Sequence, residues 1–285
     1  MCLRTGDIIV KEKRGVFGRH PLVLSPHPGI IPGIMLAVFS MIFLGAVGVS
    51  HAGEMVASIT KVKKSVVGVG TLMLTRSPRA NLLGTGFIVA DGNHVLTNAH
   101  VVSRELDFHG KESLVVFIGR GVNPETRSAS IVQLDREYDL ALLKIPGPPL
   151  PALSLGDSNT VQEGEEIAFT GYPIGAVLGL FPVTHRGIIS AITPIVIPLD
   201  SGRQLTPELI KRLRDRYDVF QLDATAYPGN SGSPLYNPET AEVVGVLNMV
   251  FVKESRETVL QKPSGIAYAI PIRYAVDLVD KLNKQ

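Results

Sequence analysis

The 285-residue sequence contains a single cysteine, Cys2. One cysteine can form neither a disulfide within the chain nor a metal cluster held by several thiolates. Net charge is also scarce, with a formal value of +2 at pH 7. Residues 1–52 hold five basic and two acidic residues, so the rest of the chain is nearly neutral. A nearly neutral body gives no electrostatic indication of nucleic-acid binding.

Fixed charges are absent from residues 20–53, and residues 34–49 are almost entirely apolar. An apolar run preceded by basic residues is typical of an export signal or of a membrane anchor. Ser50 and Ala52 are small residues at the two positions that a signal peptidase recognises, which favours cleavage after Ala52. The alternative is an uncleaved anchor over residues 30–50, and a start at Met35 would shorten the leader in either case. We therefore expect an exported protein of the periplasm or cell envelope.

Short segments rich in β-branched residues, separated by turn-forming residues, run through the body of the chain. This pattern predicts an all-β fold of the barrel or sandwich type. The strands that we expect are 66–74, 84–90, 94–97, 114–118, 128–134, 140–145, 166–170, 184–192, 219–222, 243–249 and 265–270.

A proline-rich connector at residues 146–151 divides this body into two β units. Such a connector is stiff and cannot continue a helix. We expect a leader containing a hydrophobic helix over residues 1–52, a first β unit over residues 53–150 and a second over residues 151–285.

Two segments of the second unit have a helical pattern. Residues 206–217 begin with a threonine suited to the N-cap and a proline suited to the first helical position. Residues 271–283 carry apolar side chains at helical spacing, which predicts a C-terminal helix with one buried face.

Ser231 lies in a turn-forming stretch, close to Gly229 and Gly232 and flanked by Pro228 and Pro234. Glycines let consecutive backbone N–H groups converge on one point beside the serine hydroxyl. A nucleophile next to an anion-binding site is what acyl transfer requires. Taken alone, the same stretch could be an ordinary surface turn.

His100 follows the strand expected at 94–97, and Asp139 leads directly into the strand expected at 140–145. A carboxylate at the edge of an apolar strand needs a partner, and a histidine N–H can provide one. A histidine held through one ring nitrogen keeps the other nitrogen available to take a proton from Ser231. Each residue alone could be structural, whereas the three together form a possible catalytic set.

The order His100, Asp139, Ser231 is that of chymotrypsin-type proteases, whereas the serine comes first in α/β-hydrolases. In these residues the sequence resembles trypsin-like serine proteases, and most closely the bacterial HtrA/Deg branch. The stretches that carry the resemblance run in family order from about residue 60 to the C-terminus: Gly84-Thr85-Gly86-Phe87, Thr97-Asn98-Ala99-His100-Val101-Val102, Tyr138-Asp139-Leu140-Ala141-Leu142, Gly171-Tyr172-Pro173-Ile174-Gly175, Gly187-Ile188-Ile189-Ser190-Ala191, Pro228-Gly229-Asn230-Ser231-Gly232 and Ala267-Tyr268-Ala269-Ile270-Pro271.

The resemblance implies two packed six-stranded antiparallel β-barrels and a serine endopeptidase activity. It assigns Ser231 as nucleophile, His100 as general base and acid, and Asp139 as the residue that orients the histidine. It also implies an oxyanion hole formed by the N–H groups of Gly229 and Ser231, and no metal or organic cofactor.

The same resemblance locates the substrate pocket. Thr225 falls at the base of the S1 pocket, where a carboxylate would be needed to select lysine or arginine. Ala226, Asn248, Met249 and Val250 fall on or near the pocket walls, and the last two are bulky. We expect polypeptide substrates cleaved after small aliphatic residues. A second interpretation of Asn248, as a hydrogen-bond partner of the catalytic aspartate, remains open at this point.

Three positions depart from the trypsin pattern. Asn230 replaces the aspartate that receives the newly cut N-terminus of trypsin-type zymogens, so we do not expect activation by that ion pair. Val101 stands where trypsins carry a cysteine. Ser233 replaces a glycine after the nucleophile and leaves the fine geometry of the turn open.

HtrA relatives usually continue into one or two PDZ domains, which we do not expect here because the sequence stops after its last helix. Their absence keeps a second function open, that of a catalytically silent, protease-like binding or chaperone protein. Assembly into a homo-oligomer and association with a membrane through the leader are also left open.

Overall fold

The computed structural model describes residues 51–107, 109–173, 179–194, 217–248 and 265–284. Contacts divide the chain into two units, Met1–Val49 and Ser50–Gln285, and every element below belongs to the second. The apolar part of the predicted leader lies outside the described residues, as does the helix predicted at 206–217 except for Tyr217. Within the described part of the chain, no helix has both the length and the apolar character needed to cross a membrane.

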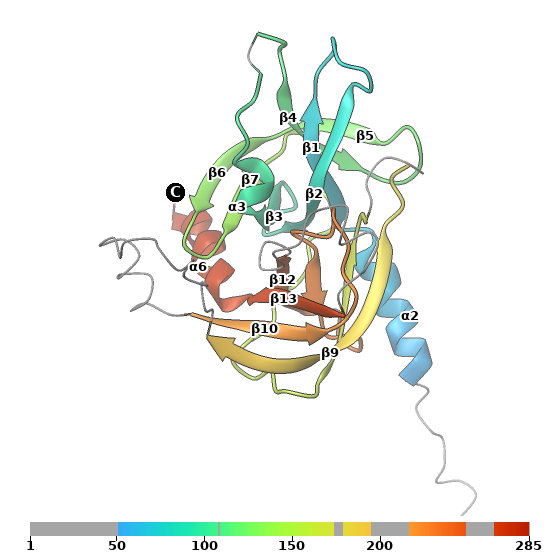
Figure 1. Cartoon of the computed structure of the whole chain (residues 1–285), viewed down its shortest axis with the longest axis vertical. Helices are drawn as coiled ribbons and strands as arrows, with labels where there is room; N and C mark the ends of the chain where they lie inside the picture. The colour runs from blue at the N-terminus through green and yellow to red at the C-terminus, as the bar shows by residue number, and fades with distance from the viewer. Residues whose placement is uncertain (1–50, 108, 174–178, 195–216, 249–264, 285) are drawn as a thin grey trace, which may run out of the picture. The chain divides into compact units, whose positions relative to one another are not determined.

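The first half of the body is a seven-stranded antiparallel sheet with the strand order β5-β4-β1-β2-β3-β7-β6 (Figure 1). The bounds are β1 Val66–Leu72, β2 Ala80–Val89, β3 His94–Asn98, β4 Ser113–Ile118, β5 Glu125–Ser128, β6 Ser130–Asp135 and β7 Leu140–Lys144.

The two edge strands of this sheet, β5 and β6, are separated in sequence by Ala129 alone. Two residues of extended chain span at most roughly 7 Å, so the two edges of the sheet must approach each other there. The sheet therefore curls into a barrel-like shape. The strand predicted at 128–134 corresponds to β6, and sequence analysis missed β5, a four-residue strand without apolar side chains.

The second half is a closed barrel of six strands in the order β10-β13-β12-β11-β8-β9. The bounds are β8 Glu166–Gly171, β9 Val183–Pro194, β10 Asp218–Asp223, β11 Pro234–Tyr236, β12 Val243–Asn248 and β13 Ile266–Pro271. The predicted all-β architecture is confirmed, and the second unit has the six strands expected, whereas the first is a sheet of seven strands instead of six. Sequence analysis missed β11, because a three-residue strand that begins with proline has no room for a recognisable alternation.

Helices are few in the described residues: α2 His51–Val62, α3 Ala99–Val102, α6 Arg273–Asp280 and the 3₁₀ turn η2 Lys281–Lys284. The helix predicted at 271–283 corresponds to α6 and η2, and it starts later because Pro271 is the last residue of β13. Ala275, Leu278 and Val279 form its buried face.

The largest cluster of buried apolar residues belongs to both halves of the body. It contains Phe87 and Leu142 from the first sheet, Val246 from the barrel, and Ala275 from α6. Two further clusters lie within the single halves. The two β units thus share a core, which holds their facing loops, and the candidate catalytic residues on them, in fixed positions.

Candidate active site

His100 and Asp139 are brought together by the pairing of two neighbouring strands. Asn98 at the end of β3 pairs with Leu140 at the start of β7, so the residues just beyond this pair face each other. His100 lies in the short helix α3 that follows β3, and Asp139 is the residue immediately before β7. Both side chains keep partial contact with solvent, with 31% and 21% of their area exposed.

Asp139 accepts hydrogen bonds on both carboxylate oxygens and on its backbone carbonyl. Oδ1 accepts the backbone N–H of His100 at 2.8 Å, and Oδ2 lies 2.6 Å from His100 Nδ1. Oδ2 also accepts the side-chain amide of Asn248 at 2.8 Å. The carbonyl accepts the N–H of Ala99 at 3.0 Å and the side-chain amide of Asn98 at 3.1 Å. Five donors from three segments therefore fix one aspartate.

The backbone of Asp139 adopts φ +53°, in the left-handed region that few non-glycine residues enter. Aspartate is among the residues that tolerate this region best. Asn248 is fully buried in β12, and its bond to Asp139 is the contact that one interpretation of the sequence predicted. The bond also joins the second barrel to the histidine–aspartate pair of the first sheet.

Three tyrosines pack beside Asp139. Tyr138 stacks on Tyr274 of α6 with ring centres 4.5 Å apart, and Tyr217 lies edge-on to Tyr138 at 5.0 Å. Burial and, second, the negative charge of Asp139 raise the pKa of Tyr217. The Tyr217 phenol therefore stays neutral at physiological pH and adds no second negative charge beside the aspartate.

Two successive β-turns form the segment around Ser231, which is a central residue of the second turn. The Asn230 N–H donates to Tyr227 O at 3.0 Å, with Pro228 and Gly229 as the central residues and Gly229 at φ +101°. Proline followed by a residue with positive φ is characteristic of a type II turn.

The second turn has the same form. The Ser233 N–H donates to Asn230 O at 3.0 Å, and Gly232 has φ +85°. Among the described residues, the N–H groups of Gly229 and Ser231 donate to no other backbone group. Both donors predicted for an oxyanion hole are therefore uncommitted.

Gly84 brings the nucleophile turn close to α3. A Cβ atom on Gly84 would lie 2.8 Å from the Val101 side chain and 2.9 Å from Ser231 O, so only glycine fits between them. In the described residues no hydrogen bond joins the hydroxyl of Ser231 to the ring of His100. Unliganded active sites often have loose contacts of this kind that tighten when substrate binds.

Behind Ser231 lies a buried polar cluster. Asn230 and Ser233 are fully buried, and within the described part of the chain neither side chain has a hydrogen-bond partner. A Cβ on Gly171 would overlap Ser233 Oγ and would lie 2.9 Å from both Asn230 Oδ1 and Thr85 Oγ1. Three side-chain oxygens thus converge on one glycine at the end of β8.

The predicted substrate-pocket residues are described only in part. Thr225 is half-buried and Ala226 is buried in the core of the second barrel, and neither carries a charge. Asn248 points its amide at Asp139. Met249 and Val250 lie outside the described residues.

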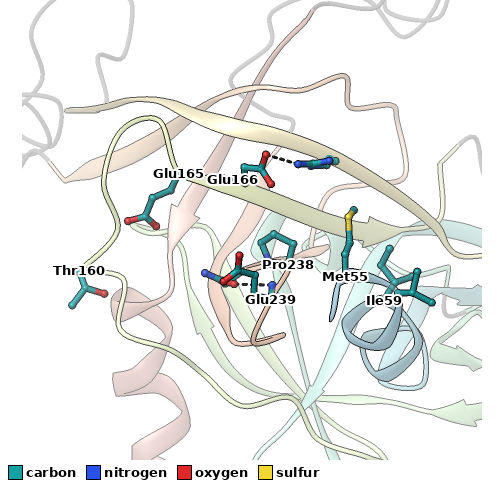
Figure 2. Close-up of a pocket in the computed structure, with 10 residues that line it drawn as sticks. Met55, Ile59, Thr160, Glu165, Glu166, Pro238 and Glu239 are labelled. Carbon is teal, nitrogen blue, oxygen red and sulfur yellow. Dashed lines mark hydrogen bonds and ion pairs between the residues drawn. The ribbon is translucent and has the colours of Figure 1, made fainter. Parts of the chain in front are cut away.

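A separate pocket of about 910 Å³ opens between α2 and the barrel (Figure 2). Met55 and Ile59 of α2 form one side of it, and Glu165, Glu166 and Glu239 lie toward the barrel side. None of its lining residues belongs to the histidine–aspartate–serine set. Among the residues that the structure describes, no group of histidine, cysteine or carboxylate side chains is arranged to hold a metal ion.

Comparison with known proteins agrees with this geometry, since residues 84–246 match the trypsin-like peptidase domain family. The chain belongs to this family. Among individual relatives of this trypsin-like peptidase domain, the probable periplasmic serine endoprotease DegP-like of Halomonas elongata is 34% identical over 202 residues, which cover 70% of this chain and 35% of the relative. The protein of the same description from Pseudomonas putida is 34% identical over 216 residues, covering 73% of this chain and 38% of the relative.

A solved structure gives the same picture of the fold. The HtrA-type protease AlgW with decapeptide superposes with a TM-score of 0.59 at 24% identity, covering 81% of this chain and 68% of that one. The chain spans little more than a third of the length of the curated relatives that it matches.

Sequence analysis assigned no role to one residue near the nucleophile. Thr85 belongs to the stretch Gly84-Thr85-Gly86-Phe87 that resembles the HtrA branch, but nothing in the sequence indicates what its hydroxyl contacts. In the structure that hydroxyl donates to Gly229 O at 2.7 Å, across the boundary between the two β units. Contacts between segments this far apart in sequence leave no local pattern.

Proposed function

We propose that this chain is a serine endopeptidase that cleaves polypeptides through an acyl-enzyme. The observation that carries the proposal is the bonding of Asp139 to both His100 and Asn248, next to a turn that leaves two N–H groups free beside Ser231. Membership of the trypsin-like peptidase family supports the same conclusion.

In the proposed reaction, Ser231 Oγ attacks the carbonyl carbon of the scissile peptide while its proton passes to His100 Nε2. Asp139 accepts the hydrogen of His100 Nδ1, which leaves Nε2 as the basic nitrogen and stabilises the imidazolium ion once it forms. The N–H groups of Gly229 and Ser231 bind the oxyanion, and losing one such donor typically costs roughly a hundred- to a thousandfold in rate.

The tetrahedral intermediate collapses when His100 gives its proton to the leaving amine, so that Ser231 becomes acylated and the new amino terminus departs. Water then attacks the ester carbonyl with His100 again acting as base. The second tetrahedral intermediate collapses when His100 passes the proton taken from water to Ser231 Oγ, which releases the carboxyl product and restores the enzyme. The original Ser231 proton leaves on the new amino terminus.

For substrates, we propose exported or misfolded polypeptides cleaved after small aliphatic residues. Thr225 and Ala226 offer no charge to a lysine or arginine side chain, which supports this choice. The periplasmic description of the relatives supports a site of action outside the cytoplasm. A peptide library cleaved mainly after lysine or arginine would contradict the proposed specificity.

A fluorophosphonate probe, which reacts with an activated serine, tests the proposed function directly. We expect the purified full chain to be labelled, and the variants Ser231→Ala and His100→Ala to remain unlabelled although folded by circular dichroism. Absence of labelling in the folded wild type would instead favour the catalytically silent binding protein.

A further inference from the structure

Thr85 belongs to strand β2 of the first sheet, yet it bonds the nucleophile turn of the second barrel through two separate groups. Its hydroxyl donates to Gly229 O at 2.7 Å, and its backbone N–H donates to Ser231 O at 2.8 Å. The residue is fully buried. Water therefore does not compete freely for these hydrogen bonds.

The remaining polar groups of Thr85 are also occupied, which fixes the direction of the hydroxyl hydrogen. Oγ1 accepts the N–H of Tyr172 at 3.0 Å, and the carbonyl accepts the hydroxyl of Thr97 at 2.7 Å. A hydroxyl has one hydrogen to donate. Because the Tyr172 N–H takes an acceptor position, that hydrogen points to Gly229 O.

Hydrogen bonds fix three consecutive peptide groups of the nucleophile turn, and Thr85 bonds the first and the third of them. In the first, Gly229 O accepts from Thr85 Oγ1 and the Asn230 N–H donates to Tyr227 O. In the third, Ser231 O accepts from the Thr85 N–H and the Gly232 N–H donates to Leu247 O at 2.9 Å. Both outer peptides are therefore fixed at each end.

The middle peptide joins Asn230 to Ser231. Its oxygen accepts the N–H of Ser233 at 3.0 Å, and its own N–H, that of Ser231, is the group left for an oxyanion. A peptide group is planar, so fixing the two flanking planes and the middle oxygen sets the direction of the free N–H. Thr85 supplies two of the five bonds that do so.

From this arrangement we infer that Thr85 is a positioning residue for the oxyanion hole. It touches neither substrate nor reacting atom, and it acts through the carbonyl groups of Gly229 and Ser231. The inference rests on the proposed function, since it presumes that the Ser231 N–H binds an oxyanion. A preorganised donor is effective because it needs no reorientation when charge develops in the transition state.

The test is Thr85→Val, which keeps the branched shape and the backbone N–H but removes the hydroxyl. We expect kcat on a peptide substrate to fall by about 10- to 100-fold, because small misplacements of catalytic groups have effects of this size. KM should stay within about twofold, because ground-state binding does not use the oxyanion hole. Thr85→Ser retains the hydroxyl and should restore most of the activity.

Affinity for a peptide boronate separates positioning from a purely structural role. The boronate forms a tetrahedral adduct on serine with an oxygen in the oxyanion hole, so its inhibition constant should rise in Thr85→Val by the same factor as kcat falls. Thr170→Val is the matched control. Thr170 is equally buried and its hydroxyl also has two partners, Thr184 and Tyr236, but none lies in the nucleophile turn. That control should keep kcat and boronate affinity near wild type.

The outcomes are distinct. Wild-type kcat in Thr85→Val, an equal fall in Thr170→Val, or failure of Thr85→Ser to recover activity would each overturn the inference while leaving the proposed function intact. An inactive wild type that no probe labels would defeat the proposed function itself. If Thr85→Val does not fold, Thr85→Ala replaces it, because its smaller side chain cannot clash with its neighbours. Its kcat is then calculated per folded molecule, with the folded fraction measured by circular dichroism.

Discussion

The two sides of the candidate active site are bonded very differently. On one side, Asp139 accepts five hydrogen bonds, two from His100 and one from Asn248 among them. On the other, the buried side chains of Asn230 and Ser233 have no hydrogen-bond partner within the residues that the structure describes. Both carboxylate oxygens of Asp139 thus accept hydrogen bonds, whereas the nucleophile turn contains buried side-chain atoms that find no partner among the described residues.

An unsatisfied buried polar group typically costs about 1–3 kcal/mol, so a rearrangement that gives such a group a partner is favourable. We therefore expect substitutions on the two sides of the candidate active site to have different effects on activity. Changes beside Asp139 should remove an established arrangement and reduce the rate of chemistry. Substitutions behind Ser231 should shift the position of the nucleophile turn. A second substitution that restores the lost space can then compensate for the first.

Asp139→Asn should have the largest effect. The amide can place its N–H₂ group against His100 Nδ1, which would leave the hydrogen on Nε2 and remove the base that Ser231 needs. We expect kcat to fall by about 10⁴-fold with the melting temperature little changed, as measured by peptide hydrolysis and calorimetry. A fall of less than tenfold would show that Asp139 does not orient the histidine.

Gly171→Ala tests the nucleophile side. The new methyl group would overlap Ser233 Oγ and crowd Asn230 Oδ1, so the turn must move. We expect kcat to fall by roughly 100-fold, a typical result of small displacements of catalytic groups.

The double variant Gly171→Ala with Ser233→Gly supplies the control. Removing the Ser233 side chain vacates the volume that the methyl group needs, so activity should return to within about tenfold of wild type; neighbouring substitutions that share a steric contact are not additive. Equal activities in the single and double variants would break the proposed link between the polar cluster and the turn.

Asn248→Ala removes one of the two side-chain donors to the Asp139 carboxylate and should have a smaller effect. Hydrogen bonds to a charged group contribute about 1.5–3 kcal/mol, but His100 still contacts both carboxylate oxygens. We expect kcat to fall by about tenfold with KM unchanged in steady-state assays. A rise in KM alone would mean that Asn248 serves the substrate pocket instead.

Glu112→Gln should hardly change catalysis but should change the pH dependence of stability. Hydrogen bonds from Thr71 and Arg76, followed by the N–H of Asp107, lower the pKa of Glu112 to about 2. Because the folded-state pKa lies below the ordinary value, this carboxylate stabilises the fold above about pH 4.5, and the stabilisation is lost as the pH falls toward 2.

The difference in melting temperature between wild type and Glu112→Gln should therefore be largest near neutral pH and shrink between about pH 5 and pH 2. Thermal unfolding across this range measures it, with kcat at pH 7 within twofold of wild type as the control. A constant difference would contradict the proposed role of the Glu112 carboxylate.

The sequence predicted most strands and the three candidate catalytic residues because these leave local signals. Short runs rich in β-branched residues mark strands such as β1 and β12, and glycines and prolines mark the turn around Ser231. The resemblance to a known family then supplied the roles of residues that lie far apart in sequence. Strand β5 left no such signal, because its four residues include no apolar side chain.

The sequence could not show what surrounds the nucleophile. A stretch rich in glycine, proline and serine looks like an exposed turn, yet Asn230 and Ser233 are fully buried. The positive φ of Asp139 and the bonds of Thr85 arise from contacts between segments that are distant in sequence. Periodicity and turn chemistry report neighbours along the chain, and these features depend on neighbours in space.

The shared core has a consequence for the order in which the candidate active site is assembled during folding. Tyr274 of the C-terminal helix stacks on Tyr138, next to Asp139, and Ala275 packs in the cluster that contains Phe87 of the first sheet. The first β unit, although translated earlier, therefore completes its core only when the last helix docks. We therefore expect a chain truncated before α6 to hold all three candidate catalytic residues without the packing that fixes Tyr138 beside Asp139.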